Sequence, residues 1–232
     1  MAINTLIFDL DDTLLDFRGG EVQDIRALFE KHAKLSGQAL EKALLTYQDI
    51  NQKLWHQYEE KTIDRTEIFE KRFPETLAAL DLADQVDAQL MEEEYAFLRD
   101  HNYRMIDGAK DLLQSLSGRY TILAGTNGQE ETQLRRLKET RLMPYFDQVF
   151  TSESLGIAKP DARFFEKIFA ARPKMQKEQT IMIGDGLNSD ILGGQNAGIE
   201  TIWVNLQKQP LPADLKPTKI VHSLNELKTL LQ

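Results

Sequence analysis

Two carboxylates stand two residues apart near the start of the chain, directly after a short apolar run. The run covers residues 5–8 (TLIF), and Asp9 and Asp11 follow it. An apolar run bounded by polar residues predicts a buried parallel strand, and open α/β sheets bind ligands at the carboxyl ends of their strands. An acidic pair at that edge repels itself unless a positive charge lies beside it. A hard divalent cation such as Mg²⁺ meets this need, so we predict a metal-dependent site at the end of the first strand.

Polar residues suited to phosphate and metal chemistry follow three later strand-like segments. They are Thr126-Asn127-Gly128, Lys159, and the segment from Asp185 to Asp190. Each feature alone is common, because a threonine after a strand often begins a helix and a single lysine is usually solvated. The carboxyl ends of parallel strands share one edge of a sheet, so we expect these groups to meet. Together they would supply a nucleophile, a proton carrier, phosphate donors, a cation and metal ligands.

The remaining sequence predicts an α/β fold with a doubly wound, Rossmann-like parallel sheet, interrupted by one helical insertion. From about residue 107 onwards, apolar strand-like runs alternate with helical segments, as in a parallel sheet with helices on both faces. Residues from about 20 to 99 show helical periodicity and few strand signals. We therefore predict a core domain of residues 1–16 and 104–232 and an all-helical cap domain of residues 17–103.

Local signals give expectations about where individual helices begin and end. Pro74 is expected to stop the third helix of the insertion, because proline lacks a backbone N–H. Asp107 is predicted to cap the first helix after the insertion, and Ser223 the last helix of the chain. A helix is expected from Asp190 to Asn196, after the fourth strand.

The composition is that of a soluble globular protein with a net negative charge. The 232 residues include 28 Lys and Arg against 37 Asp and Glu, for a net charge of −9. Nucleic-acid binders need a basic face, so we expect no nucleic-acid partner, whereas a small phosphorylated ligand needs only a few local donors. The absence of cysteine excludes a disulfide framework, a thiolate metal site and a cysteine nucleophile. Because no apolar run approaches membrane-spanning length, we expect a cytoplasmic protein that binds no membrane. We further expect a monomer or a small homo-oligomer.

The motif residues, in this order, resemble the haloacid dehalogenase superfamily of phosphohydrolases. The resemblance covers the whole chain, because the helical insertion stands where that family places its type-1 cap. Two further segments are most similar to the pyrimidine 5′-nucleotidase subgroup. The residues that carry the family resemblance are 9–13 (DLDDT, the family's DxDxT), Thr126, Lys159 and Gly184-Asp185 with Asp190 (its GDxxxxD-type motif), and those of the subgroup are 51–58 (NQKLWHQY) and 189–198 (SDILGGQNAG).

The resemblance implies a Mg²⁺-dependent phosphomonoester hydrolase that works through an aspartyl-phosphate intermediate. Asp9 would be the nucleophile, and Asp11 would protonate the leaving alcohol and then deprotonate the hydrolytic water. Mg²⁺ would be held by Asp9, the backbone carbonyl of Asp11, and Asp185. Thr126 and Lys159 would bind the phosphate, and Lys159 would also contact Asp9.

Four other residues have supporting roles in this interpretation. Thr13 would fix the loop that aims Asp11, and Asp190 would act through metal-bound water or a contact with Lys159. Asn127 and Gly128 would offer backbone N–H groups to the phosphate, and the Asn127 side chain could also reach a substrate ring or ribose.

The helical cap is where substrate selection is expected. Trp55, Tyr58, Arg65 and Phe69 are candidates for contacts with a base or sugar. Aromatic residues at helical spacing usually pack inside, so an equally good interpretation makes these rings part of the cap core. We predict a nucleoside 5′-monophosphate as the substrate, with sugar phosphates and phosphoglycolate as alternatives.

Other activities share part of this pattern. A phosphomutase has the same core motifs but needs cap residues for a second phosphate, and the sequence does not identify any. A dehalogenase needs neither Mg²⁺ nor a general acid beside the nucleophile, so Asp11 argues against it. An aspartate-phosphorylated receiver domain is about half this length and has its phosphoacceptor beyond a later strand. A Ca²⁺ loop is rejected because Leu14 and Gly20 stand where the turn glycine and the bidentate glutamate are required.

Overall fold

The computed structural model describes residues 2–232, and the chain divides into two compact units. The larger unit contains residues 1–17 and 103–232, and the smaller unit contains residues 18–102. All six strands belong to the larger unit. Every helix among the described residues is too short or too polar to span a lipid bilayer.

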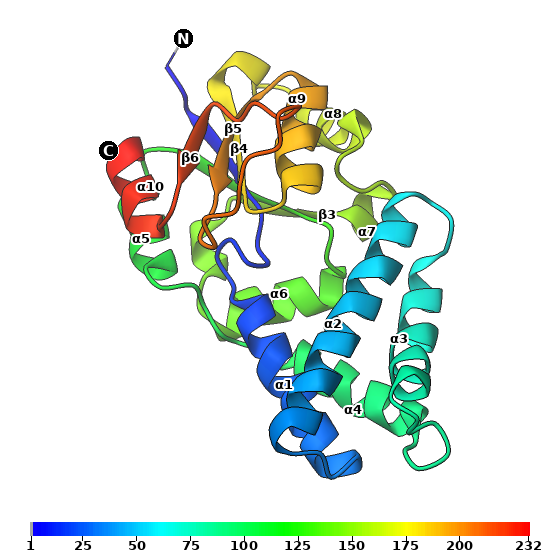
Figure 1. Ribbon diagram of the computed structural model, residues 1–232. Helices are drawn as coiled ribbons and strands as arrows, with labels where there is room; N and C mark the ends of the chain where they lie inside the picture. The colour runs from blue at the N-terminus through cyan, green and yellow to red at the C-terminus, as the bar shows by residue number, and fades with distance from the viewer. Residues whose placement is uncertain (1) are drawn as a thin grey trace. The chain divides into compact units, whose positions relative to one another are not determined.

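The larger unit is built on a six-stranded sheet in the order β3-β2-β1-β4-β5-β6 (Figure 1). Every pair of neighbouring strands is parallel, which confirms the predicted fold class. Because the order reverses on either side of β1, the carboxyl ends of β1, β2 and β4 lie together at the switch point where such sheets bind ligands. The strands are β1 (Thr5–Phe8), β2 (Thr121–Thr126), β3 (Gln148–Thr151), β4 (Thr180–Gly184), β5 (Glu200–Val204) and β6 (Lys219–Val221).

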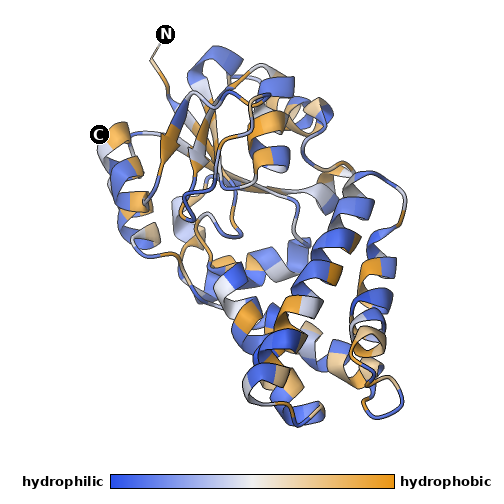
Figure 2. Ribbon diagram, in the orientation of Figure 1, coloured by the Kyte–Doolittle hydropathy of each residue, from blue (hydrophilic) through white to orange (hydrophobic). Residues whose placement is uncertain are grey.

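Helices cover both faces of this sheet, as the alternation of strands and helices predicts. Leu6 and Phe8 of β1 belong to the apolar cluster that contains side chains of α5, α6 and α10, whereas Ile7 belongs to the one that contains Phe164 and Phe165 of α8. Strand side chains point alternately to the two faces, and the three central strands β1, β2 and β4 are buried on both faces along nearly their whole length. Figure 2 shows hydrophobic residues, in orange, along strands of this sheet. The helical segments are α5 (Ala109–Leu116), α6 (Glu130–Glu139), η1 (Met143–Tyr145), α7 (Ser152–Leu155), α8 (Ala162–Ala171), η2 (Lys177–Gln179), η3 (Leu187–Leu192), α9 (Gly193–Ala197) and α10 (Leu224–Leu231).

Helix starts in the larger unit differ from two of the expectations. The prediction that Asp107 caps α5 is wrong, because the N-cap is Gly108 with φ of +84°, a left-handed conformation that favours glycine. The expected helix from Asp190 is also wrong at its start, because a π-helical turn, η3, precedes α9. Ser223 does cap α10, with its hydroxyl accepting from the Glu226 N–H at 3.1 Å.

The smaller unit consists of four helices, and none of its described residues lies in a strand. Its core contains Phe29, Tyr47, Phe73 and Tyr95. The prediction that Pro74 ends the third helix is wrong, because α3 continues through it. Pro74 lies on the exposed side of α3, where water can replace the hydrogen bond that proline cannot make. The helices are α1 (Phe17–His32), α2 (Gly37–Glu59), α3 (Arg65–Ala79) and α4 (Ala88–Asp100).

Candidate active site

A buried ammonium group joins two carboxylates at the carboxyl ends of β1 and β4. The Lys159 Nζ donates to Asp9 Oδ1 at 2.7 Å, to Asp190 Oδ1 at 2.6 Å and to the Gly125 carbonyl at 2.6 Å. Lys159 is 3% exposed and Asp190 is 1% exposed. A lysine has three N–H donors, so all of them are satisfied inside the protein. The structure therefore brings together Asp9, Lys159 and Asp190, as predicted from sheet geometry.

Burial and the neighbouring charges both shift the pKa of Asp9 and of Lys159. Burial raises the pKa of Asp9 well above its ordinary value, Lys159 opposes the shift, and Asp190 and Asp185 add to it. Burial alone would lower the pKa of Lys159, but the carboxylates of Asp190 and Asp9 raise it above its ordinary value. Lys159 is therefore a permanent cation at neutral pH.

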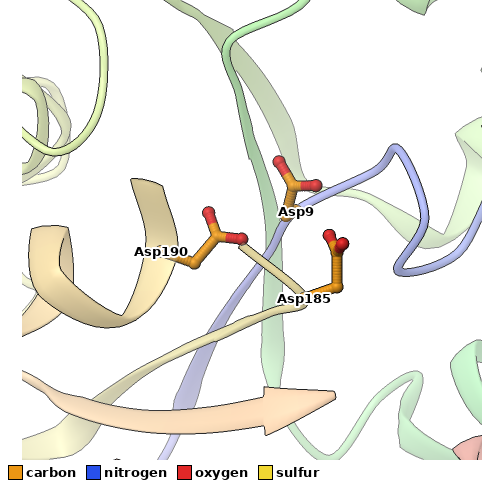
Figure 3. Close-up of side chains that lie close together, drawn as sticks. All are labelled: Asp9, Asp185 and Asp190. Carbon is orange, nitrogen blue, oxygen red and sulfur yellow. The ribbon is translucent and has the colours of Figure 1, made fainter. Parts of the chain in front are cut away.

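Three carboxylates converge beside this ammonium. One oxygen from each of Asp9, Asp185 and Asp190 lies within 4.8 Å of the others, and Figure 3 shows the three side chains gathered at the strand ends. With all three carboxylates ionised, the single ammonium of Lys159 leaves two formal negative charges in the cluster. Carboxylate oxygens are the ligands that Mg²⁺ prefers, so both the donor set and its charge fit a hard divalent cation.

Thr13 connects the loop after β1 to the loop after β4. Its Oγ1 accepts from the Asp185 N–H at 2.9 Å and donates to Asp185 Oδ1 at 3.3 Å. The indole N–H of Trp203 donates to the Asp185 carbonyl at 2.9 Å. Thr13 is fully buried. The threonine therefore positions Asp185 directly, whereas the sequence predicted that it would fix the loop around Asp11.

The π-helical turn η3 holds Asp190 against Lys159. The N–H groups of Asp190 and Ile191 both donate to the Gly186 carbonyl, at 2.8 and 3.1 Å, and the Gly186 N–H donates to Asp190 Oδ2 at 2.9 Å. A Cβ at Gly184 would lie 2.1 Å from Asp190 Oδ2. Glycine at position 184 therefore makes room for this carboxylate, and both oxygens of Asp190 accept hydrogen bonds.

The predicted phosphate-binding segment follows β2. Thr126 Oγ1 accepts from the Gly128 N–H at 2.9 Å and from Gln133 Nε2 at 3.3 Å, so its own hydrogen can be donated to a ligand. Asn127 holds the Lys159 segment: its Nδ2 donates to the Lys159 carbonyl at 3.0 Å, and its Oδ1 accepts from the Lys159 N–H at 2.9 Å. Contact of Asn127 or Gly128 with a substrate stays a prediction.

Two residues that the sequence analysis did not identify bind the carboxylate of Asp11. Gln133 Nε2 donates to Asp11 Oδ2 at 2.5 Å, and Arg136 Nη1 donates to Asp11 Oδ1. Both side chains are 1% exposed and lie on α6. Their three-residue spacing places them on one helix face, beside the buried Leu137. That shared face is the signal that could have identified them.

The cap candidates form a group of their own within the smaller unit. The rings of Trp55 and Tyr58 meet edge to face with centroids 5.8 Å apart, and the Arg65 guanidinium lies 5.8 Å from the Trp55 ring and 5.9 Å from that of Phe69. Trp55, Tyr58 and Phe69 are half-buried and are not among the buried aromatics of the core of this unit. Their contact with a substrate stays a prediction.

Comparison with known proteins identifies the family. The family model for haloacid dehalogenase-like hydrolases matches residues 3–198. The chain belongs to this family. It is 39% identical over 228 residues to the pyrimidine 5′-nucleotidase PynA of Streptococcus pneumoniae, covering 98% of this chain and 94% of that protein. It is 30% identical over 231 residues to the pyrimidine 5′-nucleotidase YjjG of Escherichia coli, covering 100% and 99%.

A solved structure supports the same assignment. The magnesium-bound HAD-hydrolase YfnB of Bacillus subtilis superimposes on this haloacid dehalogenase-like hydrolase with a TM-score of 0.89, at 35% identity and with 100% of each chain covered. The predicted family and the prediction of an enzyme, a phosphatase of this family, are both confirmed.

Proposed function

We propose that the chain is a Mg²⁺-dependent phosphatase that hydrolyses pyrimidine nucleoside 5′-monophosphates through a covalent phosphate on Asp9. The observation that carries the chemistry is the buried Asp9 carboxylate, held 2.7 Å from the Lys159 ammonium inside a cluster of three carboxylates. The substrate class is supported by two relatives named pyrimidine 5′-nucleotidase that match nearly the whole chain.

Asp9, Asp185 and the backbone carbonyl of Asp11 would hold the metal ion in this proposal. Asp190 is assigned a supporting role, because both of its oxygens already accept hydrogen bonds from Lys159 and the Gly186 N–H. When bound, Mg²⁺ offsets the repulsion between the Asp9 carboxylate and a phosphate and stabilises charge in the transition state, an effect of several kcal/mol.

In the first step, a carboxylate oxygen of Asp9 attacks the phosphorus. The new bond joins Asp9 to phosphorus, the ester P–O bond breaks, and Asp11 transfers its proton to the leaving 5′-oxygen of the nucleoside. Lys159 holds Asp9 for attack, and the hydroxyl of Thr126 donates to a phosphoryl oxygen. Buried donors that are already oriented lose little free energy to reorganisation during the reaction.

In the second step, water releases the phosphate. Asp11, now a carboxylate, takes a proton from the water as the water oxygen attacks the phosphorus. The bond between phosphorus and Asp9 breaks, which regenerates the Asp9 carboxylate and frees inorganic phosphate. Over the full cycle Asp11 donates one proton to the leaving oxygen and takes one proton from water, so the protonation of the enzyme is unchanged.

A phosphate-release screen tests the proposal. Pyrimidine and purine nucleoside 5′-monophosphates, sugar phosphates and phosphoglycolate are assayed with Mg²⁺, with excess chelator, and after Mg²⁺ is added back. We expect the highest kcat/KM with pyrimidine nucleotides, no turnover with chelator, and recovery with Mg²⁺. If a sugar phosphate were the best substrate, the proposed substrate class would be wrong. If turnover were unchanged by the chelator, the reaction would not depend on a metal ion.

Two matched amide variants test the nucleophile. Asp9→Asn should abolish turnover without unfolding the protein, because an amide oxygen is a poor nucleophile. Asp12→Asn is the control: it makes the same change in the same loop, at a residue with φ of +58°, which asparagine tolerates. Substantial turnover by Asp9→Asn would show that another group attacks the phosphorus.

A further inference from the structure

The carboxylate of Asp11 is held from one side by helix α6. Gln133 Nε2 donates to Asp11 Oδ2 at 2.5 Å, and Arg136 donates to Asp11 Oδ1. The Asp11 side chain is 29% exposed, whereas the Arg136 side chain is 1% exposed. The donors are therefore fixed in the interior, and the acid that they hold can still be reached from outside.

A single amide links Asp11 to the predicted phosphate-binding residue. Besides Asp11, Gln133 Nε2 contacts Thr126 Oγ1 at 3.3 Å. An amide nitrogen carries two hydrogens, one for each of these acceptors. The opposite orientation of the amide would place its oxygen against a carboxylate, so the hydrogen-bond pattern determines the orientation. Gln133 thereby sets the distance between the acid and the threonine.

The surroundings leave the two donors little freedom. A Cβ at Gly128 would lie 2.1 Å from Gln133 Nε2 and 2.7 Å from Gln133 Cδ, so the glutamine packs directly on the glycine backbone. The Arg136 guanidinium lies 5.6 Å from the centre of the Phe17 ring. Side chains locked by packing hold a reacting group within the narrow limits that catalysis needs.

Helix stability does not account for this arrangement. Arginine and glutamine are rarely this deeply buried, and removing them from water is unfavourable unless each is paired. The acceptor for both is the carboxylate to which the proposed function gives the proton-transfer role. The neighbouring Arg135, whose side chain is 32% exposed, forms an ordinary helix-surface ion pair with Glu131 one turn away at 2.6 Å.

We propose that Gln133 and Arg136 are positioning residues for proton transfer by Asp11. They aim the carboxyl group at the leaving oxygen, and Gln133 keeps it in register with Thr126 and therefore with the phosphate. This inference rests on the proposed function, because it requires Asp11 to be the general acid. The role predicts dependence on the leaving group: a nucleoside alkoxide needs a proton to depart, whereas p-nitrophenolate leaves as a stable anion.

Single-turnover release of the leaving group tests this role, with Mg²⁺ present and enzyme in excess over a pyrimidine nucleoside 5′-monophosphate or p-nitrophenyl phosphate. General acid catalysis contributes roughly 10²–10⁴-fold, so partial misplacement by Gln133→Met or Arg136→Met should slow the nucleotide about 10- to 100-fold. Both variants should slow the aryl ester less than about threefold, a limit that follows because its departure needs no general acid. Arg136→Lys should restore part of the nucleotide rate, since it keeps a cation near Asp11.

Controls separate the possible failures. Arg135→Met changes a partly exposed arginine of the same helix that pairs with Glu131 rather than with Asp11, so it should change neither rate. Asp11→Asn should reproduce the leaving-group dependence. If Arg136→Met does not fold, Gln133→Met carries the test, because methionine has nearly the volume of glutamine. Equal losses with both esters, or no loss with either, would overturn the positioning role while leaving the phosphatase proposal intact. A wild-type protein inactive on both esters would instead overturn the proposed function and this inference with it.

Discussion

Replacing Lys159 by methionine tests the buried ion cluster on which the candidate site depends. Methionine approximates the length of the lysine side chain but has no N–H donor. The variant leaves the carboxylates of Asp9 and Asp190 and the Gly125 carbonyl without the donor that contacts all three. The two carboxylates then face each other without the ammonium between them, so the larger unit should lose stability.

The burial of the partners sets the size of the effect. Removing one partner from a buried ion pair costs about 3–5 kcal/mol, whereas an exposed pair contributes at most about 1 kcal/mol. The side chains of Lys159 and Asp190 are each 1% exposed, so the larger range applies. The folded state raises the pKa of Lys159 above its ordinary value of 10.5. Its contribution is therefore complete below that value and is lost only as the pH rises through the folded pKa, so the effect should be as large at about pH 9 as at about pH 7.

Urea unfolding followed by tryptophan fluorescence measures the loss. Of the two tryptophans, Trp203 lies in the larger unit on β5, so a Trp55→Phe background isolates its signal. With a urea slope of about 2 kcal/mol per molar, the midpoint of this transition should fall by about 1.5–2.5 M. Lys167→Met, an exposed lysine on α8, is the matched control and should leave the midpoint nearly unchanged.

A second variant shows whether charge is the cause. Adding Asp190→Asn to Lys159→Met removes one of the two facing carboxylates, so the double variant should recover at least about 1 kcal/mol relative to Lys159→Met alone. A midpoint shift below about 0.5 M for Lys159→Met corresponds to the stability of a surface ion pair. That result would refute the view that this cluster is buried and tightly paired.

Three further substitutions probe the surroundings of the cluster. Gly184→Ala places a Cβ 2.1 Å from Asp190 Oδ2, so it should lower the free energy of unfolding, measured by thermal denaturation, by about 1–3 kcal/mol and slow turnover. Wild-type stability and rate would contradict the close packing of Asp190 on Gly184. Thr13→Val removes the acceptor of the Asp185 N–H, so it should lower the free energy of unfolding by about 1–3 kcal/mol. It should also raise the Mg²⁺ concentration needed for half-maximal activity. An unchanged Mg²⁺ dependence would show that Thr13 does not position the metal site. Trp55→Ala should lower kcat/KM for pyrimidine nucleotides about tenfold, the size of one lost base–aromatic stack, and leave kcat/KM for small alkyl phosphates unchanged. Equal effects on both substrates would show that Trp55 does not contact the base.

The convergence of Asp9, Lys159, Asp185 and Asp190 was predictable because sheet geometry, not local conformation, brings them together. Parallel strands end at one edge, so placing each motif after a strand was sufficient. The position of Asp190 within η3 was not predictable in the same way. A π-helical turn depends on one extra residue per turn, and the packing of Asp190 against Gly184 and Lys159 selects it.

Gln133 and Arg136 escaped prediction for a different reason. The α6 sequence is rich in charge, and a polar side chain in such a helix is solvated unless tertiary packing buries it. Arg136 is buried where the loop that carries Asp11 approaches α6, whereas its neighbour Arg135 pairs with the exposed Glu131. The one sequence signal for this difference is that Arg136 shares a helix face with Gln133 and Leu137. Pro74 shows the opposite case, in which a strong local signal was misleading. The proline predicts a helix end, but α3 continues through it because the missing hydrogen bond faces solvent.

The chain leaves and re-enters the larger unit through two segments that run side by side. Leu15 and Met105 form an antiparallel bridge, and the Ile106 N–H donates to the Leu14 carbonyl at 3.0 Å. All strand ladders lie outside residues 18–102. Excising those residues and closing the paired stem with a short turn would therefore keep the whole sheet, and grafting an unrelated module onto the stem would leave the strand ends in place. The stem therefore marks a place where the intervening segment can be exchanged while every ladder of the sheet is kept.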